Sequence, residues 1–304
     1  MLITRETVGQ LVEAARTRQG WIRQVTWSPN GRALAVASAE GITLLDAQSL
    51  EKRGWLKGHD GPVKSIAVNG DGTRIISGGA DTTVRLWNLA KGGTCQVLNG
   101  HQDAVDAVAL RGDGQQVASA GADKVIRLWD AESGEETQTL EGHEDEVTSL
   151  AYCLNDTLLA SGSRDATIRL WDSEGTVRHT LRHESWVRQL VTSPDTRLLA
   201  SASRDATVKL WDVETGAEVL LLLAHEGGAD AVAFSPDGKL LATAGRDNAI
   251  KFWDAASGEH LHMLQAHEKP VLTLAFSPDG TYLATGSGDN TVRLWRVGQA
   301  VSAQ

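Results

Sequence analysis

A histidine and a tryptophan recur at a fixed distance along this 304-residue chain, and this repetition restricts the fold more than any other feature. Six of the ten tryptophans end the same alternating phrase, at intervals of 42, 42, 40, 42 and 42 residues: Trp87, Trp129, Trp171, Trp211, Trp253 and Trp295. A histidine precedes each of them by 28 residues: His59, His101, His143, His183, His225 and His267. Eighteen residues after each histidine stands a hydroxyl side chain: Ser77, Ser119, Ser161, Ser201, Thr243 and Thr285. Twenty-two residues after each histidine stands an aspartate: Asp81, Asp123, Asp165, Asp205, Asp247 and Asp289. Such self-similarity predicts an architecture of stacked repeats.

A seventh, degenerate unit precedes these six. Residues 27–46 align with residues 234–254 after one deletion, although the polar residues that mark the other units are replaced. The residues at the histidine, hydroxyl, aspartate and tryptophan positions are Arg18, Val36, Glu40 and Leu45. Seven units then fill the chain, over approximately these residues: 12–46, 55–90, 97–131, 139–173, 179–213, 221–255 and 263–297.

Each unit has the local pattern of short β-strands. The stretch 167–171 alternates between polar and apolar residues, which is the period of a half-buried strand. The sequence Ser-Pro-Asp-Gly at 235–238 and at 277–280 predicts type I turns between such stretches. We therefore expect four short strands in each unit. Helical periodicity interrupts this pattern at one place, near the start of the chain: Val8, Leu11, Val12 and Ala15.

The succession of Gly-His, hydroxyl, Asp and Trp-Asp at a period of roughly 40 to 45 residues resembles the WD-repeat (WD40) family. The resemblance covers nearly the whole chain, with departures such as Arg-His at 182–183 and Trp-Arg at 295–296. It implies an all-β fold, a single seven-bladed β-propeller of four-stranded antiparallel blades over residues 1–304. In this family the repeat is offset from the blade, so residues from about 11 to 18 are expected to add the last outer strand and close the ring. The alternative for part of residues 5–15 is a free amphipathic helix.

A serine, a histidine and an aspartate in every unit suggest a hydrolase triad, but we interpret them as a structural network. A catalytic triad acts as one exposed nucleophile beside an oxyanion hole, whereas this chain has six copies. Each copy also ends on an indole N–H, which can only donate a hydrogen bond. We expect Asp to accept from His, His to bond the hydroxyl, and the hydroxyl to accept from Trp. The histidines cannot converge on one metal ion because they lie one to a blade, so we expect no catalytic residue, metal or cofactor.

Composition restricts the class of partner. A net charge of -10 and a pI near 5.4 argue against a general nucleic-acid-binding protein, which needs basic surface. The longest apolar run, residues 219–224, is too short to span a bilayer, and the first residues lack the apolar core of a signal peptide. The two cysteines, Cys95 and Cys153, suit a reducing compartment. We therefore expect a soluble, cytoplasmic protein without membrane contact.

Function is expected at positions that differ between blades, because the repeated positions are scaffold. The resemblance implies that the residue before the tetrad aspartate, and the residues three and five after the histidine, lie where the central channel opens. These positions bring an aromatic residue and arginines onto neighbouring blades: Trp186, Arg188, Arg164, Arg204 and Arg246, with Trp21 and Arg23 on the degenerate unit. Trp and Arg are enriched at interface hot spots, and guanidinium groups bind carboxylates and phosphates. We predict a site for an acidic or phosphorylated protein or peptide. The alternative is that the arginines pair with loop acids such as Glu184 or Glu226.

Two other functions remain open. Asp106, Glu146 and Asp230 also fall at channel positions, so the chain could be a propeller enzyme or a small-ligand or cation sensor. Against this, Asp106 and Asp230 are three units apart and should face each other across the channel. The close similarity among units also resembles bacterial WD-repeat proteins, in which a propeller regulates or targets an attached effector domain. We expect a monomer, because ring closure removes the open edge of a sheet.

Overall fold

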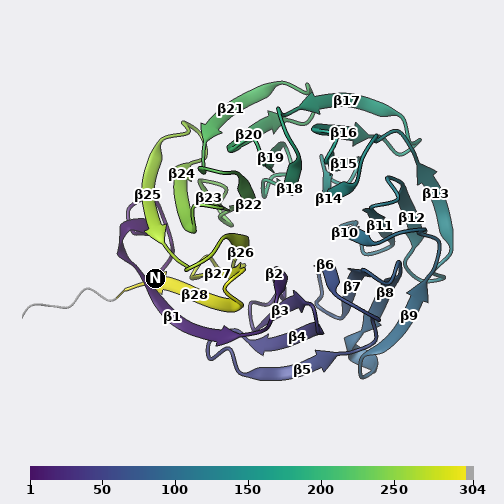
Figure 1. Cartoon of the computed structure of the whole chain (residues 1–304), viewed down its shortest axis with the longest axis horizontal. Helices are drawn as coiled ribbons and strands as arrows, with labels where there is room; N and C mark the ends of the chain where they lie inside the picture. The colour runs from purple at the N-terminus through teal and green to yellow at the C-terminus, as the bar shows by residue number, and fades with distance from the viewer. Residues whose placement is uncertain (299–304) are drawn as a thin grey trace, which may run out of the picture.

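The computed structural model describes residues 1–298 as a ring of seven sheets around a central channel (Figure 1). Each sheet has four antiparallel strands, and the seven sheets contain all 28 strands found in the described residues. We call the sheets blades and number them along the chain. The predicted all-β, seven-bladed propeller is confirmed.

In every blade the first strand lines the channel and the last lies at the rim (Figure 1). Blade 1 contains β2 (Ile22–Trp27), β3 (Ala33–Ser38), β4 (Gly41–Asp46) and β5 (Lys52–Leu56). Blade 2 contains β6 (Val63–Val68), β7 (Arg74–Gly79), β8 (Val84–Asn88) and β9 (Thr94–Leu98), with the short 3-10 helix η2 (Leu89–Lys91). Blade 3 contains β10 (Val105–Leu110), β11 (Gln116–Gly121), β12 (Ile126–Asp130) and β13 (Glu136–Leu140). Blade 4 contains β14 (Val147–Cys153), β15 (Leu158–Ser163), β16 (Thr167–Trp171) and β17 (Val177–Arg182).

The remaining blades follow the same order. Blade 5 contains β18 (Val187–Thr192), β19 (Leu198–Ser203), β20 (Thr207–Asp212) and β21 (Glu218–Leu223). Blade 6 contains β22 (Ala229–Phe234), β23 (Leu240–Gly245), β24 (Ala249–Asp254) and β25 (His260–Gln265). Blade 7 combines β26 (Val271–Phe276), β27 (Tyr282–Ser287) and β28 (Thr291–Val297) with β1 (Leu11–Arg18) from the start of the chain.

The N-terminal segment closes the ring, as predicted. Strand β1 pairs antiparallel with β28, from Leu11 opposite Val297 to Arg18 opposite Thr291, with a bulge after Glu13. The alternative of a free amphipathic helix is wrong, because only the 3-10 turn η1 (Val8–Gln10) is helical. The apolar residues before β1 do not form a helix but pack on blade 6. Ile3 and Val8 are buried there in one cluster with Phe252. Blade 7 thereby gains its outer strand from the opposite end of the chain.

The hydrophobic core lies between blades. One cluster joins Ala35 and Ile42 of blade 1 to Ile75 and Trp87 of blade 2, and the other junctions repeat this arrangement. Near the channel the blades approach closely, which restricts side-chain size. A Cβ atom added to Gly162 of blade 4 would lie 2.6 Å from a methyl group of Val187 in blade 5. Within residues 1–298, no helix has the length and apolar composition that crossing a membrane requires.

Candidate functional site

The four repeated residues form one hydrogen-bonded network in each of blades 2 to 7, which we call the tetrad. The histidine Nδ1 lies 2.7–2.9 Å from the aspartate carboxylate, and the histidine Nε2 lies 2.7–2.9 Å from the hydroxyl. The tryptophan Nε1–H donates to the same hydroxyl at 2.8–3.0 Å. Because an ionised carboxylate can only accept, Nδ1–H of the neutral ring donates to it, and Nε2 is left to accept from the hydroxyl, which itself accepts from the indole N–H. These hydroxyls are buried, so no tetrad presents a nucleophile at the surface.

The tetrad environment shifts the pKa values of its members. Burial lowers the pKa of His59 and of His267, which favours the neutral ring. Burial alone would raise the pKa of Asp81, but hydrogen bonds from His59, the Asp60 amide and Thr83 lower it to about 2. A threonine 24 residues after the histidine supplies the same hydroxyl bond to the aspartate at 2.6–2.8 Å in four blades: Thr83, Thr167, Thr207 and Thr291. This fifth position was not predicted from the sequence, although its distance from the histidine is constant.

Three of the predicted partner-binding residues form a stack across the junction of blades 4 and 5. The guanidinium carbon of Arg164 lies 4.7 Å from the Trp186 ring centroid, and that of Arg204 lies 5.2 Å from it. Each arginine follows the second strand of its blade, and Trp186 precedes β18. The backbone N–H of Arg204 donates to the Trp186 carbonyl at 2.9 Å, which fixes the two loops together. Trp186 is partly exposed and Arg204 is exposed, so a partner can reach this stack.

The other two predicted arginines converge on a buried carboxylate. Arg188 donates from Nε to Asp230 at 3.1 Å, and the Nε of Arg246 lies 3.4 Å from the second Asp230 oxygen. The Asp230 side chain is only 2% exposed. Arg164 likewise pairs with Glu146 at 2.9 Å. The alternative that the arginines pair with nearby acids therefore holds for Arg164, Arg188 and Arg246. The acids are Glu146 and Asp230, and not the named examples Glu184 and Glu226.

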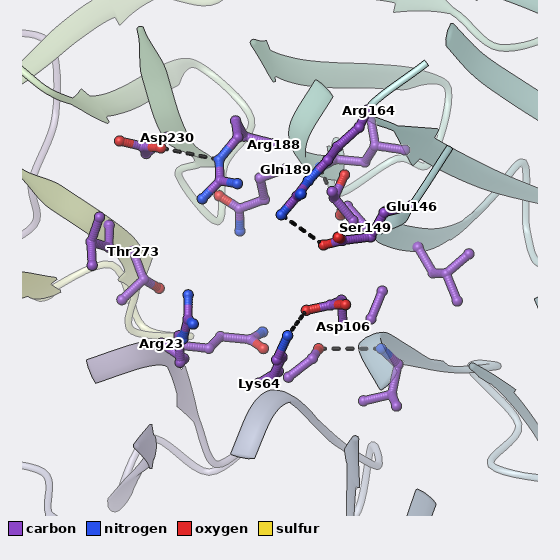
Figure 2. Close-up of a pocket in the computed structure, with 18 residues that line it drawn as sticks. Arg23, Lys64, Asp106, Glu146, Ser149, Arg164, Arg188, Gln189, Asp230 and Thr273 are labelled. Carbon is purple, nitrogen blue, oxygen red and sulfur yellow. Dashed lines mark hydrogen bonds and ion pairs between the residues drawn. The ribbon is translucent and has the colours of Figure 1, made fainter. Parts of the chain in front are cut away.

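The residues five after the tetrad histidine line the channel itself (Figure 2), where they surround a polar cavity of about 200 Å³. In blade order these positions hold Arg23, Lys64, Asp106, Thr148, Arg188, Asp230 and Leu272. Lys64 of blade 2 donates to Asp106 of blade 3 at 2.7 Å, and Arg188 of blade 5 donates to Asp230 of blade 6. Two salt bridges therefore tie neighbouring blades together inside the channel. Lys64 was not among the residues predicted from the sequence, although it occupies the same register position as Arg188.

The three channel carboxylates belong to separate ion pairs. Asp106 pairs with Lys64, Glu146 with Arg164, and Asp230 with Arg188. Burial, followed by the charge of nearby Asp106, raises the pKa of Glu146. Asp106 and Asp230 both line the cavity, as expected for residues on opposite sides of the ring. Because an arginine or lysine already neutralises each carboxylate, little free negative charge is left for a cation.

The residues six after the tetrad histidine, next to those that line the channel, form a second set of contacts between blades. In five of the seven blades this side chain accepts a hydrogen bond from a backbone N–H of the next blade, at 2.8–3.2 Å: Gln24, Ser65, Ser149, Gln189 and Thr273. The other two blades have Ala107 and Ala231 there. These contacts were not predicted from the sequence either, because amide and hydroxyl side chains are different residue types with no evident common role. Their common register position was the available signal.

Comparison with known proteins agrees with the fold. The family described as "WD domain, G-beta repeat" matches six segments: residues 50–88, 92–130, 134–172, 175–212, 216–254 and 258–296. One relative is the small ribosomal subunit protein RACK1y of Oryza sativa subsp. japonica, 34% identical over 28% of this chain and 26% of that protein. WD repeat-containing protein 1 of Xenopus tropicalis is 36% identical over 23% of this chain and 12% of its own length.

A third relative is the APC/C activator protein CDH1 of Saccharomyces cerevisiae, which is 35% identical over 22% of this chain and 12% of that protein. The matched part of the chain thus spans about a quarter or less of each of these relatives. The family segments, by contrast, cover most of the chain, and each ends on Trp-Asp or its variant. This chain belongs to the WD-repeat family.

Proposed function

We propose that the protein is a non-catalytic interaction platform that binds a protein or peptide on the channel-opening face of the propeller. The observation that carries this proposal is the stack of Arg164, Trp186 and Arg204. A rigid aromatic anchor beside arginines is the composition typical of binding hot spots. The stack is already assembled in the free protein, which reduces the ordering cost of association.

The chemistry of the stack indicates which chemical groups of a partner it would bind. Among residues 1–298, the Arg204 guanidinium stacks on Trp186 without pairing with a carboxylate, so its N–H groups are available. A planar guanidinium binds a carboxylate or phosphate through two parallel hydrogen bonds. The partner is therefore an acidic or phosphorylated segment whose apolar side chain also contacts the Trp186 ring.

Two further observations are consistent with a platform. By their names, the relatives include a small ribosomal subunit protein and an activator protein, which are roles within larger assemblies. The net charge of -10 disfavours general binding to nucleic acids, which leaves proteins as the favoured partners. A platform of this kind would act in the cytoplasm, and the same face would serve equally in a regulatory or targeting domain.

The alternative is an enzyme or a small-ligand or cation sensor that uses the channel cavity. It would depend on Asp106 and Asp230, whose charges are engaged by Lys64 and Arg188. Alanine at Asp106 and Asp230 should abolish such a site and leave a Trp186-centred interface largely intact. The platform is favoured because its central residues are accessible, whereas the channel carboxylates are mostly buried.

The first experiment is affinity capture from lysate of the source organism, followed by mass spectrometry. Wild type is compared with Trp186→Ala/Arg204→Glu. The matched control is Trp55→Ala/Lys57→Glu, because Trp55 on outer strand β5 also lies between two cations, 4.4 Å from Lys52 and 4.9 Å from Lys57. Partners lost from the first variant and retained by the control would support the channel-opening face. Retention by both variants would exclude that face, and capture of no partner by wild type would favour the channel-ligand alternative.

A further inference from the structure

The outer strands lie at the rim of the ring, far from the channel (Figure 1). Because side chains alternate along a strand, residues at i-2, i and i+2 share one face. In blades 1 to 6 we take i as the residue ten after the tetrad tryptophan, with Leu45 in place of that tryptophan in blade 1. In blade 4, where the preceding turn is one residue shorter, i is nine after Trp171. The resulting triplets are Arg53, Trp55 and Lys57; Cys95, Val97 and Asn99; Thr137, Thr139 and Glu141; Arg178, Thr180 and Arg182; Val219, Leu221 and Leu223; and Leu261, Met263 and Gln265.

Of these six triplets, the one on β21 is the only one that is entirely aliphatic. Val219, Leu221 and Leu223 are 48%, 47% and 78% exposed. Every other triplet includes a charged side chain or one that forms hydrogen bonds. Natural outer strands are normally protected from pairing by charges, proline or bulges. Strand β21 has no proline, and its one charged residue, Glu218, is bound to Lys209 of its own blade at 3.0 Å. Its one bulge lies near the start of the strand, at Val219, and the pairing with β20 is regular from Leu220 to Leu223.

The backbone of β21 is also unprotected. In its sheet β21 has one hydrogen-bonded neighbour, β20, so the N–H and C=O groups on its other edge face outward. The side chains on the opposite face of β21 pack inside the propeller. Leu222 is buried, and Leu220 packs against the core between blades 5 and 6. The exposed triplet is therefore not required for the packing of its own blade.

We propose that two copies of this chain associate by antiparallel pairing of their β21 edges. A two-fold axis at Leu221 places it opposite Leu221 of the partner subunit, and Val219 opposite Leu223 of the partner subunit. Because this axis is perpendicular to the sheet, the triplets of both copies lie on the same face. Pairing gives the outward backbone groups hydrogen-bond partners and joins six aliphatic side chains in one cluster. Blade 5 becomes half of an eight-stranded sheet.

A second copy is the occupant that this surface favours, because the triplet is self-complementary under the two-fold axis. Each copy supplies aliphatic side chains and a free strand edge, and the contact contains no unpaired charge that would select a different partner. Pairing of two six-residue strands buries a small area, so the dimer is weak and forms at high protein concentration. The net charge of -10 on each copy opposes association, so salt should strengthen the dimer.

The proposal revises the expectation of a monomer, which rested on ring closure. Closure removes the open edge between the first and last blades, but it leaves the rim edge of every blade unpaired. The β21 contact uses the rim and leaves the channel opening free, so it is independent of the platform function. Either proposal can fail without the other.

Sedimentation of the full chain tests the dimer over a range from about 1 µM to about 1 mM. The variant is Leu221→Lys, and the control is Val97→Lys, because Val97 pairs with Arg85 in blade 2 as Leu221 pairs with Lys209 in blade 5. Wild type and the control should rise from 32.5 kDa toward twice that mass. Leu221→Lys should weaken association at least about tenfold. A wild type that stays monomeric throughout, or equal association of wild type and Leu221→Lys, would overturn the proposal.

Engineered disulfides test the register and do not depend on a loss of binding. In a Cys95→Ser background, which removes the exposed thiol, Leu221→Cys should form a covalent dimer on mild oxidation. Residues directly opposite in an antiparallel pair lie about 4.5–5.5 Å apart, which suits a disulfide. Val219→Cys should cross-link with Leu223→Cys in a mixture and not with itself. Cross-linking of Val219→Cys alone as fast as Leu221→Cys would exclude the two-fold pairing.

Discussion

The guanidinium of Arg164 lies 4.7 Å from the ring centroid of Trp186, across the junction between blades 4 and 5. The same guanidinium pairs with Glu146 on the channel side, so one arginine connects the exposed aromatic ring to the charged lining of the channel. Arg204, which belongs to blade 5 as Trp186 does, lies over the same ring. The accessible anchor is therefore connected to one of the channel ion pairs, Arg164–Glu146, and the anchor is held in place before a partner binds.

Removing one tetrad hydroxyl should destabilise the propeller. Ser161→Ala leaves the Trp171 indole N–H and the His143 Nε2 without partners in a buried site. We expect a loss of about 2–4 kcal/mol in the free energy of unfolding, since each unsatisfied buried group costs about 1–3 kcal/mol. Urea unfolding measures this loss. Ser173→Ala, at an exposed position, is the control and should change stability by less than about 0.5 kcal/mol. Equal stability of the two variants would contradict the structural role of the tetrad.

Stability should fall as the solution is acidified, in two stages. Burial lowers the folded-state pKa of His59 and His267 below the ordinary value of 6.5, so the unfolded chain binds protons first and stability declines below that pH. The pKa values of Asp81 and Asp289 are lowered to about 2, so their contribution is present above the unfolded value of 3.8 and is lost toward pH 2. Urea midpoints measured from neutral pH downward should show both declines. Asp81→Asn should show a shallower decline below pH 3.8, and an unchanged slope would argue against this assignment.

Ring closure by β1 should be essential to the stability of the domain. Deletion of residues 1–18 removes the strand that pairs with β28 and exposes the buried contacts of Ile3 and Val8 on blade 6. We expect a lower thermal unfolding midpoint together with aggregation through the free β28 edge. Circular dichroism with light scattering measures both effects. Thermal unfolding identical to that of the full chain would rule out a structural role for the closure strand.

The ion pair between Lys64 and Asp106 should have a pH-dependent contribution to stability. Lys64→Met leaves Asp106 beside Glu146, whose pKa is already raised by burial and by Asp106. In the variant the Arg164 guanidinium is left as the cation beside two adjacent carboxylates, so Glu146 retains its proton more readily and the variant should lose more stability at pH 7.5 than at pH 5. Urea unfolding at both pH values tests this, with the exposed Lys91→Met as control. An equal loss at both pH values would show that charge neutralisation is not the role of Lys64.

The fold could be predicted from the sequence because four residue types keep one register in six units, and the repeated phrase resembles the WD repeat, which implies a ring of blades. The sequence predicted that Trp186, Arg164 and Arg204 lie on one face of the propeller, but it did not predict that they stack. Their stacking depends on loop conformations that one sequence does not reveal. The pairing of Arg246 and Arg188 with Asp230 was missed for a similar reason, since it depends on how far long side chains reach between blades. The apolar run at 219–224 was recognised in the sequence, but only as a segment too short for a membrane.

The most direct test of the platform function is a calorimetric titration of a captured partner, or of its acidic or phosphorylated segment, into wild type and matched variants. We predict that Trp186→Ala and Arg204→Glu each weaken binding at least about tenfold, which corresponds to about 1.4 kcal/mol. Trp55→Ala should leave the affinity unchanged, because Trp55 lies on β5 at the rim. Equal affinities for wild type, Trp186→Ala and Arg204→Glu would contradict the account and place the partner elsewhere on the propeller.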